Sequence, residues 1–285
     1  MIKDAFGRLE RHDVDVIDET LKTVNASYLS NKPFSEMSDG ERQKILIARA
    51  LAQEPEIILM DEPTSFLDAK HKIEVMLLLR KIANEKGVAI VLTTHDIELS
   101  LRICDKVILV KNGKIFAKGL PEEILTVKTL ETVYGTSSAS FEASLGTFEL
   151  CRENRNVNLH IVCGGGTGVN LMRFLAKKGV GFTAGVIHSN DIDFIVARNT
   201  ASIVIHEEPY RKIGRDRIKR AIELVEGKVV VDTGFPIGDT NAENLELLKR
   251  SSRILSFRSY DELKKLGLDS IRVKSISDVL KEVGK

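Results

Sequence analysis

The stretch from Ile57 to Glu62 constrains the fold of this chain more than any other feature. Four consecutive apolar residues, Ile57 to Met60, are followed at once by Asp61 and Glu62. A short, uninterrupted apolar run is typical of a strand in a parallel sheet. In open α/β sheets, ligands bind beyond the carboxyl ends of the strands. The sequence therefore predicts a buried strand that delivers two acids to a ligand-binding edge.

Helical and strand patterns alternate around this strand. Helical patterns occur within 1–33 and over 41–53 and 69–86, a second apolar strand over 88–93 stops just before His95, and a hairpin joins 107–110 to 114–117. Because strands separated by helices pair in parallel, the sequence predicts an α/β fold with a mostly parallel sheet covered on both faces. We expect the ends of both apolar strands to meet at one edge.

A change of composition at 136–140, Thr-Ser-Ser-Ala-Ser, precedes a second series of elements. A hairpin is expected within 141–152, followed by strands at 157–163, 181–187, 202–206, 228–232 and 252–256 and by helices at 169–178, 191–199, 214–226 and 241–250. This order is typical of a Rossmann-like parallel-sheet domain. We expect a first domain over 1–135, a linker or hairpin over 136–156, and the Rossmann-like domain over 157–285.

Composition narrows the class of protein. The 285 residues suffice for two ordinary domains, and a net charge of +1 without a strongly basic half argues against a nucleic-acid partner. The three cysteines are far apart and lack CxxC spacing, which favours free thiols in a reducing cytosol. No apolar run approaches the roughly 20 residues of a membrane-spanning helix. We therefore expect a cytoplasmic protein that reaches a membrane only through a partner.

The acids after the first strand suit phosphoryl transfer. That reaction needs a carboxylate to hold Mg²⁺ and a second group to orient the attacking water. Asp61 suits the first role and Glu62 the second, while His95 can donate a hydrogen bond to a γ-phosphate. Taken singly, the Asp-Glu pair is better explained as solvated acids at a strand end, and a lone histidine is more often a structural hydrogen-bonder. Their coincidence at two neighbouring strand ends favours the catalytic interpretation.

A further polar group opens the helix after residue 37. Ser38, Asp39, Gly40 and Glu41 combine a hydroxyl, exposed amides and the positive end of a helix, which together can bind an anion. The alternative is an ordinary N-cap with acids in the first turn. The order of all four elements along the chain argues for an anion site.

These motifs together resemble those of one family. Met37 to Glu41 resembles the signature motif of ABC-type ATPases, Ile57 to Glu62 their Walker B strand with its catalytic glutamate, Ser65 to Asp68 their D-loop, and His95 their switch histidine. The resemblance covers about residues 1–135 and implies a partial ABC ATPase domain of the P-loop NTPase type. The wording of the motifs is most similar to the importer branch that handles iron-siderophores, haem and cobalamin.

The resemblance implies roles for individual residues. Asp61 would bind Mg²⁺, Glu62 and His95 would be catalytic, and the signature residues Ser38, Asp39, Gly40 and Glu41, with Asp68 of the D-loop, would contact ATP. In this family two domains clasp ATP head to tail, so each signature serves the nucleotide of the other subunit. The implied partners are a second ATPase subunit, as a homodimer, and transmembrane permease subunits, which places the protein on the inner face of the cell membrane.

No Gly-x-x-x-x-Gly-Lys-Ser/Thr loop occurs in the 285 residues, and no Q-loop glutamine is recognisable before the signature. The resemblance implies that this phosphate-binding loop would precede Met1, so that the chain looks like an ABC ATPase truncated before its signature. We expect it to bind ATP poorly and not to turn it over alone. A gene-model truncation, a fragment and a genuine remnant all stay open, and with them whether the chain is an enzyme.

The second domain contains a glycine-rich turn, Gly164-Gly165-Gly166-Thr167-Gly168, between a strand and a helix. It predicts a nucleotide- or phosphate-binding turn, although Val169 stands where Gly-x-Gly-x-x-Gly requires its third glycine. Further polar clusters, 188–193 and 232–234, follow later strands and could line the same crevice. Tight turns and helix caps explain these residues equally well. The sequence names no ligand.

Two other functions are compatible with these motifs. The chain could be a non-hydrolysing regulatory or ligand-sensing protein, with a degenerate ABC half and a nucleotide-binding Rossmann-like domain. It could also be a soluble ABC protein of repair or translation, but such proteins carry coiled-coil insertions or duplicated cassettes, and the sequence shows neither.

Overall fold

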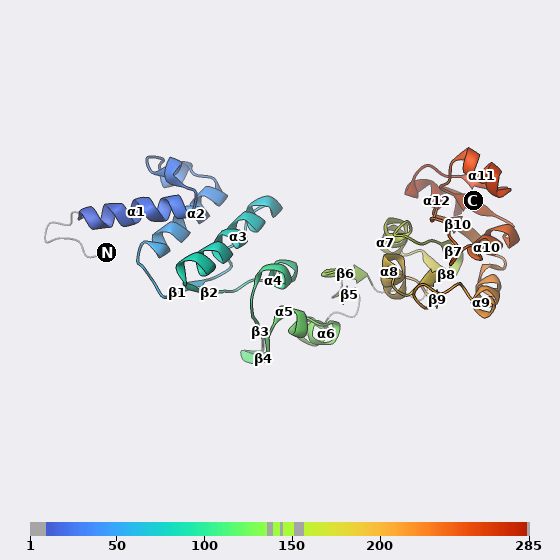
Figure 1. Ribbon diagram of the computed structural model, residues 1–285, viewed down its shortest axis with the longest axis horizontal. Helices are drawn as coiled ribbons and strands as arrows, with labels where there is room; N and C mark the ends of the chain where they lie inside the picture. Colours follow the sequence, from blue (N-terminus) through green and yellow to red (C-terminus); the bar gives the residue numbers. More distant parts are fainter. Residues whose placement is uncertain (1–9, 136–138, 143–144, 151–156, 284–285) are drawn as a thin grey trace. The chain divides into compact units, whose positions relative to one another are not determined.

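The computed structural model describes residues 10–135, 139–142, 145–150 and 157–283, and it divides the chain into two compact units, Met1–Leu125 and Thr126–Lys285. Figure 1 shows the elements of both units. The parts of our predictions that concern 1–9, 136–138 and 151–156 lie outside the described residues. The domain boundaries expected from composition stay predictions.

The first unit consists of helices around a two-stranded parallel sheet. Its elements are α1 (Arg11–Thr23), two 3-10 turns (Ser27–Leu29 and Phe34–Glu36), α2 (Asp39–Leu51), β1 (Ile57–Met60), α3 (Ala69–Lys86), β2 (Ala89–Leu92), α4 (Ile97–Ile103), the hairpin strands β3 (Val107–Lys111) and β4 (Lys114–Gly119), and α5 (Pro121–Ile124). Strand β1 pairs with β2 in parallel, with Met60 opposite Leu92. The two strands therefore end at the same edge, as expected from the sequence.

The sheet of the first unit is buried on one face. Ile58 of β1 is buried in a cluster with Val75, Leu79 and other residues of α3. Leu59, the next residue along the strand, is 77% exposed. Successive side chains of a strand point to opposite faces, and α3 covers only one of them. For this unit the expectation of a sheet covered on both faces was therefore wrong.

The second unit contains a six-stranded parallel sheet in the order β12-β11-β10-β7-β8-β9. Its elements are α6 (Val127–Tyr134), β5 (Ala139–Glu142), β6 (Thr147–Leu150), β7 (Val157–Val162), α7 (Val169–Lys177), β8 (Gly181–His188), α8 (Ile192–Thr200), β9 (Ile203–Glu207), α9 (Arg215–Val225), β10 (Val229–Asp232), α10 (Asn244–Arg250), β11 (Ile254–Ser256), α11 (Tyr260–Leu266), β12 (Ile271–Arg272) and α12 (Ile276–Val283). The predicted Rossmann-like parallel sheet is confirmed, and its order reverses between β7 and β10.

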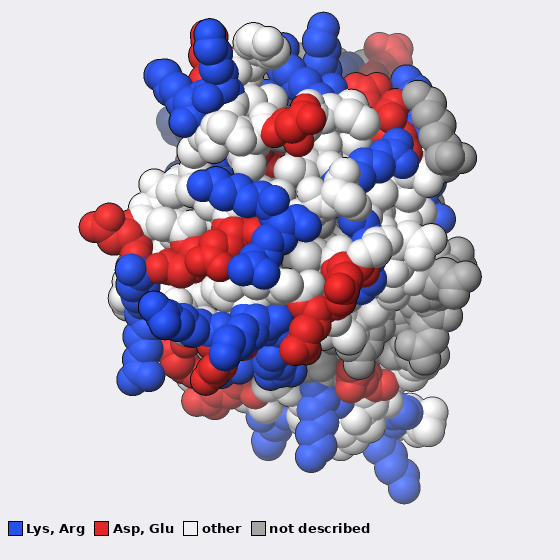
Figure 2. Space-filling model, turned by 90° about the vertical axis from the view of Figure 1, so that its right-hand side faces the viewer, with Lys and Arg blue, Asp and Glu red and all other residues white. Residues whose placement is uncertain are grey.

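Helices cover both faces of this sheet. One core cluster joins the strands to α7, α8 and α12 and includes Met172 and Val196, and the other joins them to α9 and α10 and includes Ala221 and Leu248. Strand β8 is buried continuously from Phe182 to Ile187, as a central strand of a two-sided sheet must be. On the face of the molecule in Figure 2, basic and acidic side chains are interspersed, which is typical of a solvated surface.

The antiparallel hairpin of β5 and β6 belongs to the second unit. Two buried acids on it, Glu142 and Glu149, form ion pairs with Arg198 of α8 and Arg173 of α7. Phe141 also packs edge-to-face on Phe148, with ring centroids 5.2 Å apart. The ion pairs therefore attach the hairpin to α7 and α8, and the aromatic contact joins its two strands.

His160, in the middle of β7, is fully buried and bonded through both ring nitrogens. Its Nε2 lies 2.9 Å from the carbonyl oxygen of Gly185, so this nitrogen carries the proton, and Nδ1 accepts from the Thr183 hydroxyl at 2.8 Å. Burial lowers the pKa of His160 from its ordinary 6.5 to about 4. The folded chain therefore keeps this ring neutral.

The lowered pKa predicts a pH dependence of stability. As the pH falls from 6.5 towards 4, the unfolded chain binds a proton at His160 that the folded chain does not bind, so the free energy of unfolding falls by up to about 3 kcal/mol. Urea unfolding at a series of pH values measures this loss. His160→Gln removes the titration, and its stability should fall less steeply over the same range. Equal slopes for the two proteins would contradict the assignment.

Candidate functional site

Asp61 and Thr93 lie side by side where β1 and β2 end. The hydroxyl of Thr93 donates to Oδ1 of Asp61 at 2.5 Å and accepts from the backbone N–H of Glu62 at 3.0 Å. The parallel register brings them together, because the N–H of Thr93 still bonds to the carbonyl of Met60, the last residue of β1. Thr93 thus fixes the position of one carboxylate and the backbone of the next. We did not single it out from the sequence, although a polar residue at the end of an apolar strand was a usable signal.

Glu62 and His95 also meet at this edge. His95 Nδ1 lies 3.4 Å from Oε1 of Glu62, and the Ser65 hydroxyl donates to Oε2 at 2.6 Å. The hydrogen bond from Ser65 and then that from His95 lower the pKa of Glu62, so the glutamate is held as an exposed carboxylate. Its backbone is left-handed, with φ of 44°, which is uncommon outside glycine and typical of functional sites. The predicted acids and imidazole therefore form one cluster.

The signature residues form a second cluster, at the start of α2. Ser38 is the N-cap, and its hydroxyl accepts from the N–H of Glu41 at 3.3 Å, while Oε2 of Glu41 accepts from the N–H of Ser38 at 2.8 Å. Lys32 donates to the same oxygen at 2.8 Å, and this contact does most to lower the pKa of Glu41. Ser38 and Glu41 therefore make a reciprocal capping box, which is the structural alternative to an anion site.

Gly40 and Asp68 are connected through His71. A Cβ on Gly40 would lie 2.9 Å from Cδ2 of His71, so a side chain at this position would require the His71 ring to move. Asp68 caps α3 by accepting from the N–H of His71, and its Oδ1 lies 2.9 Å from Nδ1 of the same ring. The exposed Asp39 is 3.5 Å from Arg42. The structure thus links the signature to the D-loop, and separately links Asp61 and Glu62 to His95.

The glycine-rich turn of the second unit carries two bound carboxylates. The N–H of Gly165 donates to Oδ2 of Asp191 at 2.6 Å, and the N–H of Gly168 donates to Oδ1 of Asp193 at 2.9 Å. Gly165 has a positive φ of 65°, and a Cβ on Gly168 would lie 2.7 Å from Cβ of Cys163, so both positions require glycine. Amides that a phosphate would use are engaged by the chain's own acids.

The loop after β10 closes over the same turn. The hydroxyls of Thr167, in the turn, and of Thr233, in the loop, lie 2.6 Å apart, and a Cβ on Gly165 would lie 3.3 Å from the ring of Pro236. This is the edge where the strand order reverses, and where dinucleotides bind in open α/β sheets. In this chain the loop itself contacts that part of the turn. Ile192 at the start of α8 also lies close to the turn, because a Cβ on Gly166 would be 3.2 Å from its Cγ2.

A buried ion pair holds this loop. Arg258 is 6% exposed, and its Nε donates to Oδ2 of Asp232, which is fully buried, at 2.9 Å. Arg258 also donates to the carbonyl of Phe235 at 2.7 Å and lies over its ring, 4.9 Å from the centroid. The Ser256 hydroxyl completes the pairing of Asp232. The sequence indicated Asp232 by its position at the end of a predicted strand. No motif or pattern in the sequence pointed to Arg258.

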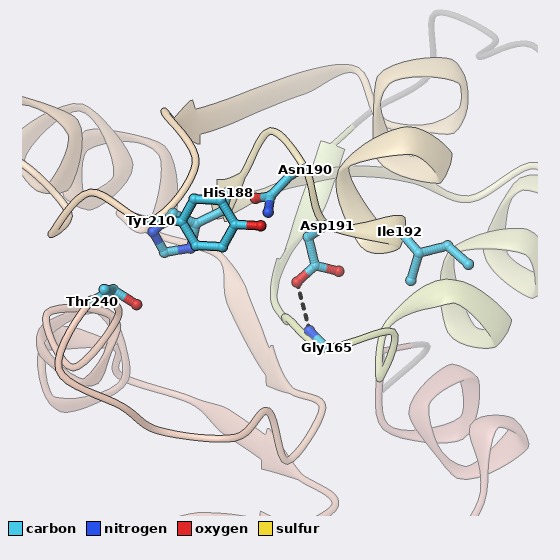
Figure 3. A pocket seen from close by; sticks show the side chains of 7 residues that line it. All are labelled: Gly165, His188, Asn190, Asp191, Ile192, Tyr210 and Thr240. Carbon is cyan, nitrogen blue, oxygen red and sulfur yellow. Dashed lines mark hydrogen bonds between the residues drawn. The ribbon is translucent and has the colours of Figure 1, made fainter. Parts of the chain in front are cut away.

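A pocket of about 440 Å³ opens beside the turn, at the ends of β7 and β8. Its lining comes from four separate segments of the chain: Gly165, His188 to Ile192 without Ser189, Tyr210 and Thr240. Figure 3 shows Asp191 bonded to Gly165, the Tyr210 ring in front of His188, and Thr240 and Ile192 at opposite sides of the view. Neither Tyr210 nor Thr240 was singled out from the sequence, because neither lies in a motif.

Comparison with known proteins agrees with this architecture. The ABC transporter family model matches residues 3–65, which include the signature and the Walker B strand, and the MJ0874 family model matches residues 182–280. In its N-terminal part the chain is similar to the ATP-binding proteins of ABC transporters, and the resemblance found in its motifs is confirmed.

Three relatives illustrate the match. The uncharacterised ABC transporter ATP-binding protein MJ0873 of Methanocaldococcus jannaschii is 54% identical over 176 residues, which are 61% of this chain and 61% of that protein. The cobalamin import ATP-binding protein BtuD of Halobacterium salinarum is 27% identical over 208 residues, covering 70% and 52%. The petrobactin import ATP-binding protein FpuC of Bacillus anthracis is 35% identical over 142 residues, covering 50% and 52%. The chain thus spans about half to three fifths of the length of these relatives.

Of the helices within the described ranges, none is both long and apolar enough to cross a membrane.

The buried ion pair gives a stability prediction. Arg258→Ala leaves the Asp232 carboxylate buried without its partner and should lower the free energy of unfolding by about 3–5 kcal/mol in denaturant titrations. The control Arg220→Ala, at an exposed position of α9, should change it by no more than about 0.5 kcal/mol. If Arg258→Ala is as stable as the control, the pair does not hold the loop.

Proposed function

We propose that this chain is an ATP-binding and ATP-hydrolysing subunit of an ABC importer for cargo of the iron-siderophore, haem or cobalamin type. The observation that carries the proposal is the cluster of Asp61, Glu62 and His95 at the common edge of β1 and β2. The names of relatives that import cobalamin and petrobactin support the importer class.

The cluster fits the metal and the nucleotide that this function requires. Asp61 has one oxygen bonded to Thr93 and is otherwise free to bind Mg²⁺, which proteins hold through one or two carboxylates together with substrate phosphates. Mg²⁺ would neutralise charge on the phosphates. Glu62, kept ionised by Ser65, would accept a hydrogen bond from the attacking water and orient it, and the exposed His95 would donate to the γ-phosphate.

The signature would serve a second subunit. Ser38, Asp39, Gly40 and Glu41 lie in a cluster of their own, joined to Asp68 through His71. In a head-to-tail homodimer these residues would face the ATP held by the partner. We propose that the dimer docks on transmembrane permease subunits and so lies on the cytoplasmic face of the membrane.

The 285 residues alone should bind ATP poorly and not hydrolyse it, because their sequence contains no Gly-x-x-x-x-Gly-Lys-Ser/Thr loop. The backbone and lysine of that loop cradle the β- and γ-phosphates. In a radiolabelled ATPase assay, the purified chain should release phosphate no faster than its Glu62→Gln variant. Ordinary turnover by the chain alone would contradict this.

A chimera tests the catalytic assignment. The chain would be joined to the portion of the 54% identical relative that lies outside the match, and the product assayed for ATP hydrolysis. We expect turnover, a loss of about 10²–10⁴ in kcat on Glu62→Gln, and no change on the control Glu56→Gln at an exposed position before β1. Equal rates for the two variants would remove Glu62 from the mechanism.

The same chimera discriminates the alternative, a non-hydrolysing regulatory or ligand-sensing protein. The observation that favours this alternative is the pocket in the second unit. If the folded chimera binds ATP but does not hydrolyse it, the regulatory function is the better one.

A further inference from the structure

The pocket of the second unit lies against a turn in which two backbone N–H groups already donate hydrogen bonds to carboxylates. The amides of Gly165 and Gly168 point to the carboxylates of Asp191 and Asp193. A bound phosphate would have to displace these carboxylates or lie beside them, and either is unfavourable for a second anion. The phosphate-binding role predicted for Gly164 to Gly168 therefore has a physical obstacle.

A second carboxylate, that of Asp193, lies close to Asp191 at this turn. Asp193 is fully buried, and its Oδ2 has no hydrogen-bond partner among the described residues. Burial first, and then the charge of Asp191, raise the pKa of Asp193 to about 6. Part of this rise comes from repulsion between the two carboxylates, so a positive charge placed near Asp191 would reduce the repulsion.

Asp191 is the charged group that the pocket exposes. Its two oxygens accept from the backbone N–H groups of Gly165 and Asp193, and within the described ranges it forms no ion pair with Lys or Arg. The seven lining residues include no lysine or arginine. The carboxylate is therefore positioned by the backbone but not compensated by a cation.

Two other residues that line the pocket are an aromatic side chain, Tyr210, and a hydrogen-bond acceptor, His188. Tyr210 is 86% exposed, and its φ of 61° is strained for a bulky residue, a feature typical of ligand-contacting positions. His188 Nε2 donates to the carbonyl of Arg211 at 2.8 Å, so its Nδ1 is an acceptor when the ring is neutral. Figure 3 shows the Tyr210 ring in front of His188, with its hydroxyl on the side of Asn190 in this view.

We propose that this pocket binds a small organic ammonium compound, with the ammonium group at Asp191 and the organic part against the ring of Tyr210. A carboxylate without a cationic partner among the described residues supplies the counter-charge, and the ring supplies apolar contact area. A volume of about 440 Å³ is within the range of small-molecule sites. The inference does not depend on whether the first unit hydrolyses ATP.

Three probes that share a phenyl ring but differ in charge test the proposal. Benzylammonium, benzyl alcohol and benzoate are titrated into the full chain by calorimetry, up to millimolar concentration and without nucleotide. We expect benzylammonium to bind at least about tenfold more tightly than benzyl alcohol, and benzoate to bind most weakly. No detectable binding of benzylammonium, or tighter binding of benzoate, overturns the proposal.

Two matched pairs of variants locate the binding. Asp191→Asn keeps the N-cap of α8, and Tyr210→Gly removes the ring while relieving the positive φ, so both should fold. Each should weaken benzylammonium about tenfold, and Asp191→Asn should leave benzyl alcohol unchanged. The controls Asp216→Asn and Tyr260→Ala lie on exposed positions outside the pocket and should bind like the unaltered chain. If Asp191→Asn matches its control, the site is not the one proposed.

Discussion

Parallel pairing of strands is the constraint on which both units depend. Because parallel strands end at one edge, residues far apart in the sequence are brought together there without any local signal between them. In the first unit, the pairing of Met60 with Leu92 places Thr93 against Asp61, more than thirty residues away, and His95 beside Glu62. In the second unit, the pairing of β7 with β8 places Asp191 and Asp193 against the glycine-rich turn.

The two edges use charge in opposite ways. At the end of β1 the acids are exposed and bonded to hydroxyls and an imidazole. At the glycine-rich turn after β7, the carboxylates of Asp191 and Asp193, which follow β8, accept hydrogen bonds from the backbone amides. A glycine-rich turn between a strand and a helix therefore specifies a backbone shape, and the side chains that follow the next strand decide which of its amides stay available.

Much of this could be predicted from the sequence, and the reasons for the misses are physical. Long periodic segments such as α3 and continuous apolar strands such as β1 have strong local patterns, and the motif order along the chain was enough to indicate the family. Short elements such as α4, α11 and β12 have too few residues to show a period. Thr93, Tyr210 and Arg258 act through contacts with distant segments, which no local pattern encodes. The exposed face of the first sheet was missed because an apolar run does not reveal how many of its faces are covered.

The hairpin of β5 and β6 has a consequence for dissecting this protein. Its buried acids neutralise arginines on two different helices of the sheet's flank, and Phe141 is among the largest fully buried side chains. A fragment cut just before β7 would keep every strand of the parallel sheet, yet it would uncover an apolar patch and leave two guanidinium groups without their counter-ions. A fragment that contains the second unit should therefore begin upstream of residue 139, since the border between the two compact units lies before the hairpin and not at the first strand of the sheet.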